Sequence, residues 1–243
     1  MEQVIVCDNP EKVAAHAAQL FVEWAKTALT QQDNFTVGLP GGKSPQLFYS
    51  VLAKQYRDAL PWDKILFFVV DEQCLPLEKM GWITQQVKEE LLIPLNCLES
   101  LACPEVCQGD PMAAAAGYSQ KIREHLSDRI NDGRALLDLI VLGMGTDGHT
   151  ATLFPGAETL RETDRWIIPG VPVDREGKEQ WLTMSLPFMT HADRVMFIVT
   201  GESKRNTLKN ILNAPLAAVG VYPAAMVRPR KDKIWVCDRS AAE

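Results

Sequence analysis

The sequence predicts an α/β fold, with a mostly parallel, Rossmann-like sheet that carries helices on both faces. Short apolar runs rich in β-branched and aromatic residues recur along the 243 residues and are typical of strands. Segments with helical apolar spacing lie between these runs. Strands that alternate with helices need crossover connections, which place helices on both faces of a parallel sheet.

The expected strands are, in order, Val4–Cys7, Phe35–Leu39, Ile65–Val70, Leu137–Leu142, Trp181–Leu186, Arg194–Thr200 and Ile234–Cys237. The expected helices are Pro10–Leu29, Ser44–Arg57, Thr84–Leu92, Pro111–Asp128 and Ser203–Leu212. The near-continuous apolar runs Ile65–Val70 and Leu137–Leu142 suit buried central strands. Because Pro155–Lys178 mixes proline, glycine and charge, we expect a long surface excursion there. Without a repeat or a linker signal, we expect a single domain over residues 1–243.

The composition excludes several classes of protein. Apolar residues make up 47% of the chain and charged residues 23%, which excludes a disordered, collagenous or coiled-coil protein. The net charge is −6, and no basic stripe is present that could neutralise several phosphates of a nucleic acid. We therefore expect no nucleic-acid partner.

The sequence also predicts a cytoplasmic protein with reduced cysteines. No apolar run approaches the ~20 residues needed to cross a bilayer, and the start Met1–Gln3 lacks the features of a signal peptide. The chain is too long to need disulfides, so reduced thiols are expected. Cys97, Cys103 and Cys107 cluster without the paired spacing of a structural zinc site, so we expect no metal. The six cysteines are Cys7, Cys74, Cys97, Cys103, Cys107 and Cys237.

The first candidate site follows the expected strand Phe35–Leu39. Gly41 and Gly42 allow close backbone approach, and Ser44 with Pro45 at the first helical position reads as an N-cap. A helix N-terminus with a hydroxyl and the adjacent Lys43 ammonium suits an anion such as phosphate. A plain strand-to-helix turn is the alternative. The spacing excludes a Walker loop.

Two carboxylates follow the expected strand Ile65–Val70. Asp71 or Glu72 could orient a ligand hydroxyl or act as a base. The alternative is a polar exit from a buried strand, and the two residues taken alone slightly favour it.

The most informative segment is Gly143–Thr150, which follows the expected strand Leu137–Leu142. Its glycines let the backbone turn sharply, and Asp147 and His149 lie two residues apart. An imidazole can take a proton from water near neutral pH, and a carboxylate can fix its tautomer. Backbone N–H groups within Gly145–His149 are candidate donors to an oxyanion. The remaining histidines lie on expected helices or a turn and are interpreted as structural or surface residues: His16, His125 and His191.

Gly143, Gly145 and Gly148 also satisfy the Gly-x-Gly-x-x-Gly pattern of dinucleotide-binding proteins. That pattern needs a long helix directly after the loop, but Phe154–Gly156 interrupts the helical spacing. A nicotinamide cofactor is therefore the weaker interpretation.

The segment Leu142–Gly156 resembles the signature loop of the 6-phosphogluconolactonases, whose superfamily also contains the glucosamine-6-phosphate deaminases. The resemblance covers essentially the whole chain. Further matching segments follow in order: Gly41–Pro45, Asp71-Glu72, Gly201–Lys204, Tyr222–Ala225 and Trp235–Asp238.

The resemblance implies hydrolysis of 6-phosphoglucono-δ-lactone to 6-phosphogluconate, the second step of the oxidative pentose phosphate pathway, without a metal or organic cofactor. It implies that His149 is the general base, with Asp147 as its neighbour. It also implies that Asp71 faces the sugar hydroxyls. The remaining expected substrate-binding residues, of which the glycine turn and Lys204 hold the phosphate, are Gly41, Gly42, Lys43, Ser44, Gln73, Gly145, Gly148 and Lys204.

The chain departs from the lactonase pattern at several positions. Gln73 and Trp181 each replace a usual arginine, and Trp82-Ile83 replaces a usual Ser-Asn pair. Pro40 replaces a serine before the glycine pair. Either Lys43 restores a positive charge and hydrolysis persists, or the chain binds a sugar phosphate without turning it over.

We favour an active enzyme, because δ-lactones open readily and modest base catalysis suffices. A deaminase fits less well, since Thr152–Pro155 stands where that branch usually has an Asn-Glu-Pro type sequence.

Overall fold

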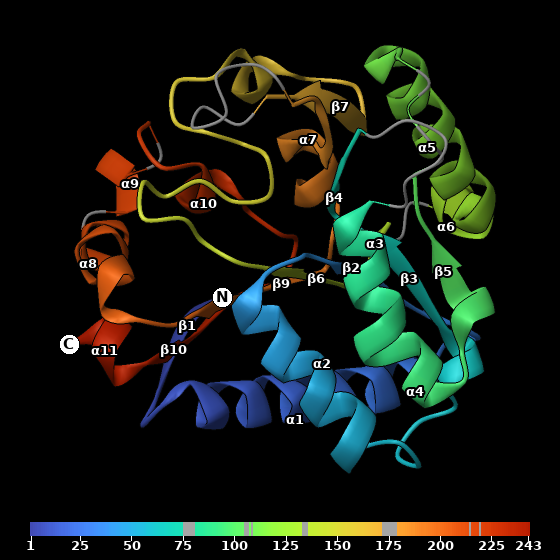
Figure 1. Cartoon of the computed structure of the whole chain (residues 1–243), viewed down its shortest axis with the longest axis horizontal. Helices are drawn as coiled ribbons and strands as arrows, with labels where there is room; N and C mark the ends of the chain where they lie inside the picture. Colours follow the sequence, from blue (N-terminus) through green and yellow to red (C-terminus); the bar gives the residue numbers. More distant parts are fainter. Residues whose placement is uncertain are drawn as a thin grey trace.

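The computed structural model describes residues 1–74, 81–104, 107, 109–132, 136–171, 179–213, 215–218 and 220–243. Two sheets form its framework (Figure 1). The larger sheet is parallel throughout, in the order β1 (Glu2–Cys7), β10 (Asp232–Asp238), β9 (Arg194–Val199), β6 (Leu139–Leu142), β2 (Phe35–Leu39), β3 (Ile65–Val69) and β5 (Leu101–Ala102). The smaller sheet is antiparallel, in the order β4 (Asp71–Gln73), β8 (Trp181–Met184) and β7 (Ile167–Gly170).

Helices cover both faces of the larger sheet, so the expected fold class is confirmed (Figure 1). Every residue of β2 and β6 is buried, as their apolar runs predict for central strands. Successive strand side chains point to opposite faces. The core is therefore divided into two apolar clusters, one on each side of the sheet.

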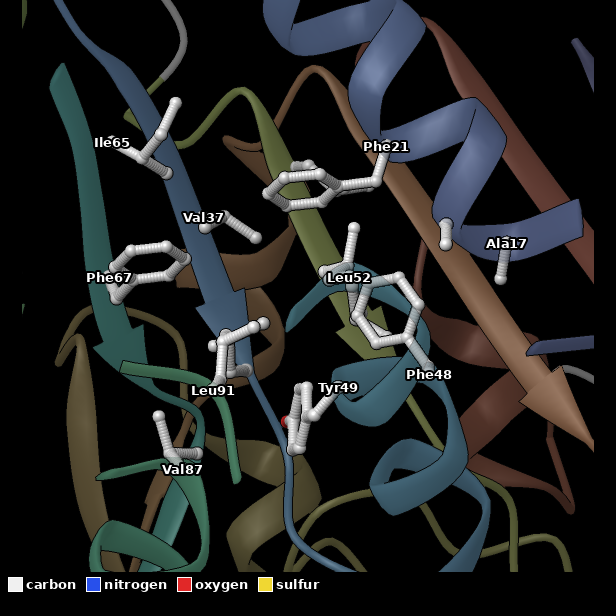
Figure 2. Close-up of a cluster of buried hydrophobic side chains, with 14 of the residues drawn as sticks. Ala17, Phe21, Val37, Phe48, Tyr49, Leu52, Ile65, Phe67, Val87 and Leu91 are labelled. Carbon is white, nitrogen blue, oxygen red and sulfur yellow. The ribbon is translucent and has the colours of Figure 1, made fainter. Parts of the chain in front are cut away.

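The first cluster lies under α1 (Pro10–Leu29), α2 (Lys43–Gln55) and α3 (Trp82–Val87). Figure 2 shows Phe21 of α1 and Phe48 of α2 pointing toward Val37 of β2. All three side chains are fully buried. Truncating a buried phenylalanine to alanine costs about 3–5 kcal/mol, so this cluster holds α2, and with it the turn that begins α2, firmly on the sheet.

The second cluster lies on the opposite face, where Phe68, Ile140 and Phe197 of the sheet meet six helices. These helices are α5 (Pro111–His125), α7 (Leu186–Thr190), α8 (Arg205–Asn213), α9 (Pro215–Ala218), α10 (Pro223–Met226) and α11 (Arg239–Ala242), and α6 (Ser127–Asp132) follows α5 along the chain. Short 3-10 helices span Trp62–Lys64, Leu98–Ser100, Glu158–Arg161 and Glu202–Lys204. Among the described helices, none combines the length and the apolar composition required to span a bilayer.

Several expected helix ends are wrong. The helix expected over Thr84–Leu92 begins at Trp82, because Glu72 accepts N–H groups of its first turn. It continues through a π-helical turn, Lys88–Leu92, into α4 (Ile93–Leu95). The helix expected over Pro111–Asp128 breaks at Leu126, and the one expected over Ser203–Leu212 opens as the 3-10 turn before α8.

The expected strand Trp181–Leu186 is too long. It ends at Met184, because Ser185 Oγ accepts the Phe188 N–H and starts α7. The other expected strands agree with β1, β2, β3, β6, β9 and β10 to within two residues at each end.

The short strands β4, β5 and β7 were not predicted, because two to four residues carry little periodicity. The surface excursion expected over Pro155–Lys178 therefore contains a strand with buried residues, Ile167–Gly170, while residues 172–178 of that segment lie outside the described residues.

The cysteines are not all reduced as expected. Cys74, next to β4, forms a disulfide with Cys107, which lies 33 residues later. The fold brings their Cα atoms within 5.0 Å, a proximity that sequence spacing does not reveal. The other cysteines are free, and no group of three or more possible metal ligands occurs among the described residues.

Candidate active site

A cavity of about 560 Å³ opens beyond the carboxyl ends of the central strands. From β2 the chain proceeds to β3 and β5 on one side of the sheet, and from β6 it proceeds to β9 and β10 on the other. The strand order therefore reverses between β2 and β6. Ligands of open α/β sheets bind at such a point, so the cavity lies where the topology favours a ligand.

Most of the expected site residues lie on the wall of this cavity: Gly41, Gly42, Lys43, Ser44, Asp71, Gly145, His149 and Lys204. Asp147 and Gly148 are not among the lining residues, but they belong to the same loop as His149, and Asp147 is hydrogen-bonded to it. Gln73 is half-buried on β4 and is not part of the lining.

The loop after β6 folds back on itself and places Asp147 beside His149. A Cβ atom at position 145 would lie 2.1 Å from His149 Nδ1, so only glycine leaves room for the ring. The Gly145 N–H donates to the His149 carbonyl at 2.8 Å, and Thr150 Oγ1 donates to the Gly143 carbonyl at 2.8 Å. The loop is followed by an isolated β-bridge between Thr150 and Leu153 and not by the long helix that the dinucleotide-binding pattern requires.

His149 and Asp147 form a hydrogen-bonded pair with Nδ1 and Oδ1 2.6 Å apart. Partial burial by itself would raise the pKa of the Asp147 carboxyl, but the backbone N–H, the charge and the ring of His149 lower it below its usual range. The ionised carboxylate can only accept, so the Nδ1–H of the imidazole donates to it, and the lone pair of a neutral ring then lies on Nε2. The imidazole is thus oriented as a general base, with its ring packed on Phe154 at 4.5 Å between centroids.

Residues near the C-terminus support this loop from behind. Gly148 has φ +81, and a Cβ there would lie 2.4 Å from Tyr222 Cδ1. The Ala224 N–H donates to the Gly148 carbonyl at 3.0 Å, and Thr207 Oγ1 donates to the Thr146 carbonyl. The position of His149 therefore depends on elements about 60 residues or more away, consistent with the need for a supported site.

The expected oxyanion donors are largely in use within the loop. The N–H groups of Gly145, Gly148 and His149 donate to the His149 carbonyl, the Gly145 carbonyl and the Asp147 carboxylate, respectively. These three groups are therefore committed to holding the loop together.

The turn between β2 and α2 is clamped by Gln86. Its side chain accepts the Gly42 N–H at 3.0 Å and donates to the Gly42 carbonyl at 2.9 Å. The expected N-cap at Ser44 is wrong, because Gly42, at φ +117, is the cap and Lys43 begins the helix. Ser44 Oγ instead pairs with Thr200 Oγ1 at 2.7 Å, and Pro45 becomes the third helical residue.

The wall formed by α2 and the chain after β9 is suited to an anion. Ser44 and Thr200 present paired hydroxyls, and the ammonium groups of Lys43 and Lys204 line the same cavity. Burial lowers the pKa of Lys204, and the negative charge of Asp147 opposes that effect. The first N–H groups of α2 have no partner within the helix and favour negative charge.

The adjacent carboxylates of β4 point to opposite sides, as strand geometry requires. Asp71 lines the cavity, and its burial raises its pKa to about 7, although a hydrogen bond from Thr152 Oγ1 at 3.0 Å opposes the rise. Glu72 accepts the N–H groups of Ile83 and Thr84 at 3.4 and 2.6 Å. Asp71 is therefore placed to meet a ligand, whereas Glu72 fixes the start of α3.

The model of the family described as glucosamine-6-phosphate isomerases/6-phosphogluconolactonase matches residues 8–236. The chain belongs to this family. It is 31% identical to the 6-phosphogluconolactonase of Nostoc sp., over 98% of this chain and 96% of that protein. It is 30% identical to the 6-phosphogluconolactonase of Rattus norvegicus, over 98% of this chain and 92% of that protein.

The fold is also shared with a solved member of the family. The crystal structure of 6-phosphogluconolactonase from Thermotoga maritima covers 98% of this chain, and the match spans 100% of that chain. The TM-score is 0.80 at 23% sequence identity.

The positions that depart from the lactonase pattern of this family adjoin one another in space. Gln73 pairs with Trp181 in the register of β4 and β8. The Trp82 ring meets the Trp181 ring edge to face, with centroids 6.4 Å apart. Ile83 follows Trp82 and packs against Gly41. We call the cavity surface formed by Trp82, Ile83 and Trp181 the aromatic wall.

Sequence reasoning missed three residues of this site: Thr152, Thr200 and Gln86. Thr200 ends an expected strand, and a hydroxyl at a carboxyl end was the signal that could have revealed it. Gln86 and Thr152 reach their partners from segments 44 and 81 residues away, so local patterns could not show them.

Proposed function

We propose that this chain hydrolyses 6-phosphoglucono-δ-lactone to 6-phosphogluconate, the reaction of the oxidative pentose phosphate pathway. The observation that carries the proposal is the Asp147–His149 pair, 2.6 Å apart, with His149 on the wall of the cavity. The relatives named 6-phosphogluconolactonase, which match almost their whole length, support it.

In this proposal His149 activates water. Nε2 accepts a proton from the water as its oxygen attacks the lactone carbonyl carbon, and a tetrahedral oxyanion forms. When the oxyanion collapses, the bond between the carbonyl carbon and the ring oxygen breaks, and the protonated His149 returns its proton to that oxygen. Asp147 keeps the ring oriented and stabilises the charged imidazolium. Ester hydrolysis by base and water requires no metal or organic cofactor.

The substrate phosphate is assigned to the start of α2. The N–H groups of its first turn, the paired hydroxyls of Ser44 and Thr200, and the ammonium groups of Lys43 and Lys204 provide donors of the kind that phosphate needs. Gly41 and Gly42 keep side chains away from that surface.

Asp71 is assigned to the sugar hydroxyls. Its carboxyl lies on the cavity wall and is held by Thr152, so it can accept a hydrogen bond from a hydroxyl of the bound lactone. Because a soluble phosphorylated sugar is the substrate, we also infer that the protein works in the cytoplasm.

A coupled assay with fresh 6-phosphoglucono-δ-lactone tests the proposal, after subtraction of the spontaneous rate. We expect the wild type to exceed that rate clearly, and His149→Ala to lose about 10²- to 10⁴-fold in kcat. His16→Gln, a change of a half-buried histidine on α1, is the matched control and should retain wild-type turnover. A wild-type rate equal to the spontaneous rate would overturn the proposal.

A further inference from the structure

We propose that the aromatic wall binds the apolar C–H face of the lactone ring and thereby helps to determine which lactones the enzyme accepts. The inference rests on the proposed function, because it takes the lactone as the occupant of the cavity. It adds a specificity-determining surface to a site whose proposed base and phosphate contacts lie elsewhere.

The wall lies directly beside the turn assigned to phosphate. A Cβ atom at Gly41 would lie 2.5 Å from Ile83 Cγ1 and 2.9 Å from Trp82 Cη2. Ser44 and His149 line the same cavity as Trp82. A lactone whose phosphate meets Ser44 and whose carbonyl meets His149 therefore places its ring within reach of the wall.

The two indoles differ in what they can offer to a ligand. Trp181 is 7% exposed and acts as a rigid backing, whereas Trp82, at 43% exposed, keeps a large free surface. Their rings are inclined by 78°, so the edge of one meets the face of the other. A sugar-derived ring carries C–H groups on its faces, and an aromatic surface attracts such groups by dispersion and by its negative face.

Glu72 holds the wall in a fixed position. Its carboxylate accepts the N–H groups of Ile83 and Thr84, and it fills the space beside Gly81, where a Cβ atom would lie 2.0 Å from Glu72 Cδ. A surface fixed before binding loses less conformational freedom when the ligand arrives. The wall is thus preorganised in the way a recognition surface requires.

Trp181 is not explained by stability alone. Its Nε1 atom is buried and has no hydrogen-bond partner among the described residues. An unpaired buried donor destabilises a fold, and phenylalanine would supply an aromatic ring without that donor. Local rules that are violated in this way concentrate at functional surfaces.

The distribution of charge in the cavity also supports a role for the aromatic wall in binding. Lys43 and Lys204 are the cationic side chains on its described wall. Lys43 is exposed, and burial lowers the pKa of Lys204, an effect that the charge of Asp147 opposes. Recognition therefore combines a small number of charges with apolar contact to the ring, a part that phosphorylated and unphosphorylated lactones share.

Steady-state kinetics with 6-phosphoglucono-δ-lactone and with unphosphorylated glucono-δ-lactone test the inference. We expect Trp82→Ala to raise KM for both lactones by a similar factor, about three- to tenfold, with kcat changed by less than about twofold. Trp82→Phe should recover most of the loss. Trp181→Phe should raise both KM values while the melting temperature is maintained, a combination that a purely structural role does not produce.

Two controls distinguish a loss of ring contact from a loss of phosphate binding and from a general effect of replacing a tryptophan. Lys204→Met should raise KM for the phosphorylated lactone alone, and Trp166→Phe, a change outside the cavity beside Arg123, should alter neither value. Unchanged KM values in both Trp82→Ala and Trp181→Phe, or a rise confined to the phosphorylated lactone, would overturn the inference.

Failure of the proposed function has a different signature, because the wild type would then hydrolyse neither lactone. Calorimetric titration with glucose 6-phosphate, which carries the same phosphate on a closed six-membered ring, still tests the wall in that event. Weaker binding by Trp82→Ala than by Trp166→Phe supports the wall as a ring-binding surface, and equal binding overturns it.

Discussion

The catalytic loop and the aromatic wall line one cavity, but they are built in opposite ways. In the loop, Asp147 fixes His149 from two residues away, and backbone hydrogen bonds close the turn around Gly145. The wall is assembled from the start of α3 and from β8, about 100 residues apart, and is held by apolar contact and one buried carboxylate. The difference teaches that the Asp147–His149 pair forms within one loop, which distant segments then support, whereas the recognition surface exists only once the tertiary fold is assembled.

Among the variants that leave His149 itself in place, the largest effect is expected from Gly145→Ala, which disturbs the loop side of this comparison. The added methyl group would occupy the space of the His149 ring, 2.1 Å from Nδ1. The ring must then move, and a displacement of about 1 Å costs on the order of 10²-fold in rate. Steady-state kcat measures the loss.

Gly117→Ala, in α5, is the matched control because no neighbouring atom of the described residues lies within 4 Å of its added Cβ. It should keep wild-type kcat. Full activity of Gly145→Ala would show that the tight loop is unnecessary for catalysis.

Lys204→Met should have the next largest effect, because it removes a charged partner of the phosphate while leaving the loop hydrogen bonds in place. The loss of a charge-assisted contact corresponds to about ten- to a hundredfold in kcat/KM for the phosphorylated lactone. The unphosphorylated lactone is the internal control in the same assay. An equal loss with both lactones would remove Lys204 from the phosphate site.

Glu72→Gln tests the aromatic wall, because it weakens the hydrogen bonds that hold the wall and leaves the catalytic loop unchanged. The amide keeps one acceptor oxygen and replaces the other by a donor, so either the Ile83 or the Thr84 N–H group loses its acceptor, and we expect a loss of about 1–3 kcal/mol in the free energy of unfolding. KM should rise a few-fold for both lactones, more than kcat falls. Denaturant unfolding and steady-state kinetics measure the two quantities.

Glu89→Gln, an exposed position on the same helical segment, provides the control for Glu72→Gln. It should change neither quantity. If Glu72→Gln behaves like this control, Glu72 does not hold the wall.

The smallest effect concerns Asp71 and appears in stability. Burial raises its pKa from 3.8 to about 7, so the folded protein keeps a proton that the unfolded chain releases at lower pH. The contribution of this group to stability is therefore fully present below about pH 4 and is lost as pH rises to about 7. Asp71→Asn does not titrate, so its melting temperature should rise relative to wild type between about pH 4 and pH 8. A difference that stays constant over this range would contradict the raised pKa.

Much of the fold could be predicted because the central strands and α1 carry long, regular apolar patterns. Helix α1 was predicted with its observed bounds, and so was β2. The three-stranded sheet was predicted only through β8, because β4 and β7, with three and four residues, gain their identity only from pairing.

Site residues could be predicted where a local sequence motif marks them, but their long-range contacts could not. The glycine-rich loop identified Asp147 and His149, which the structure joins by a hydrogen bond. Ser44 was expected as an N-cap, but its hydroxyl pairs with Thr200, a partner 156 residues away. Contacts between residues so far apart in the sequence form only in the folded protein, and no local sequence pattern indicates them.

The central claim is that the loop provides catalysis and the wall provides ligand binding. It is tested most directly when binding and turnover are both measured in His149→Ala and in Trp82→Ala. For His149→Ala we expect kcat to fall about 10²- to 10⁴-fold while the calorimetric Kd for glucose 6-phosphate, a stable phosphorylated sugar with a closed ring, stays within about twofold of wild type. For Trp82→Ala we expect Kd to rise about three- to tenfold while kcat is retained. A His149→Ala variant that turns over at the wild-type rate, or two variants that lose the same quantity, would contradict the account.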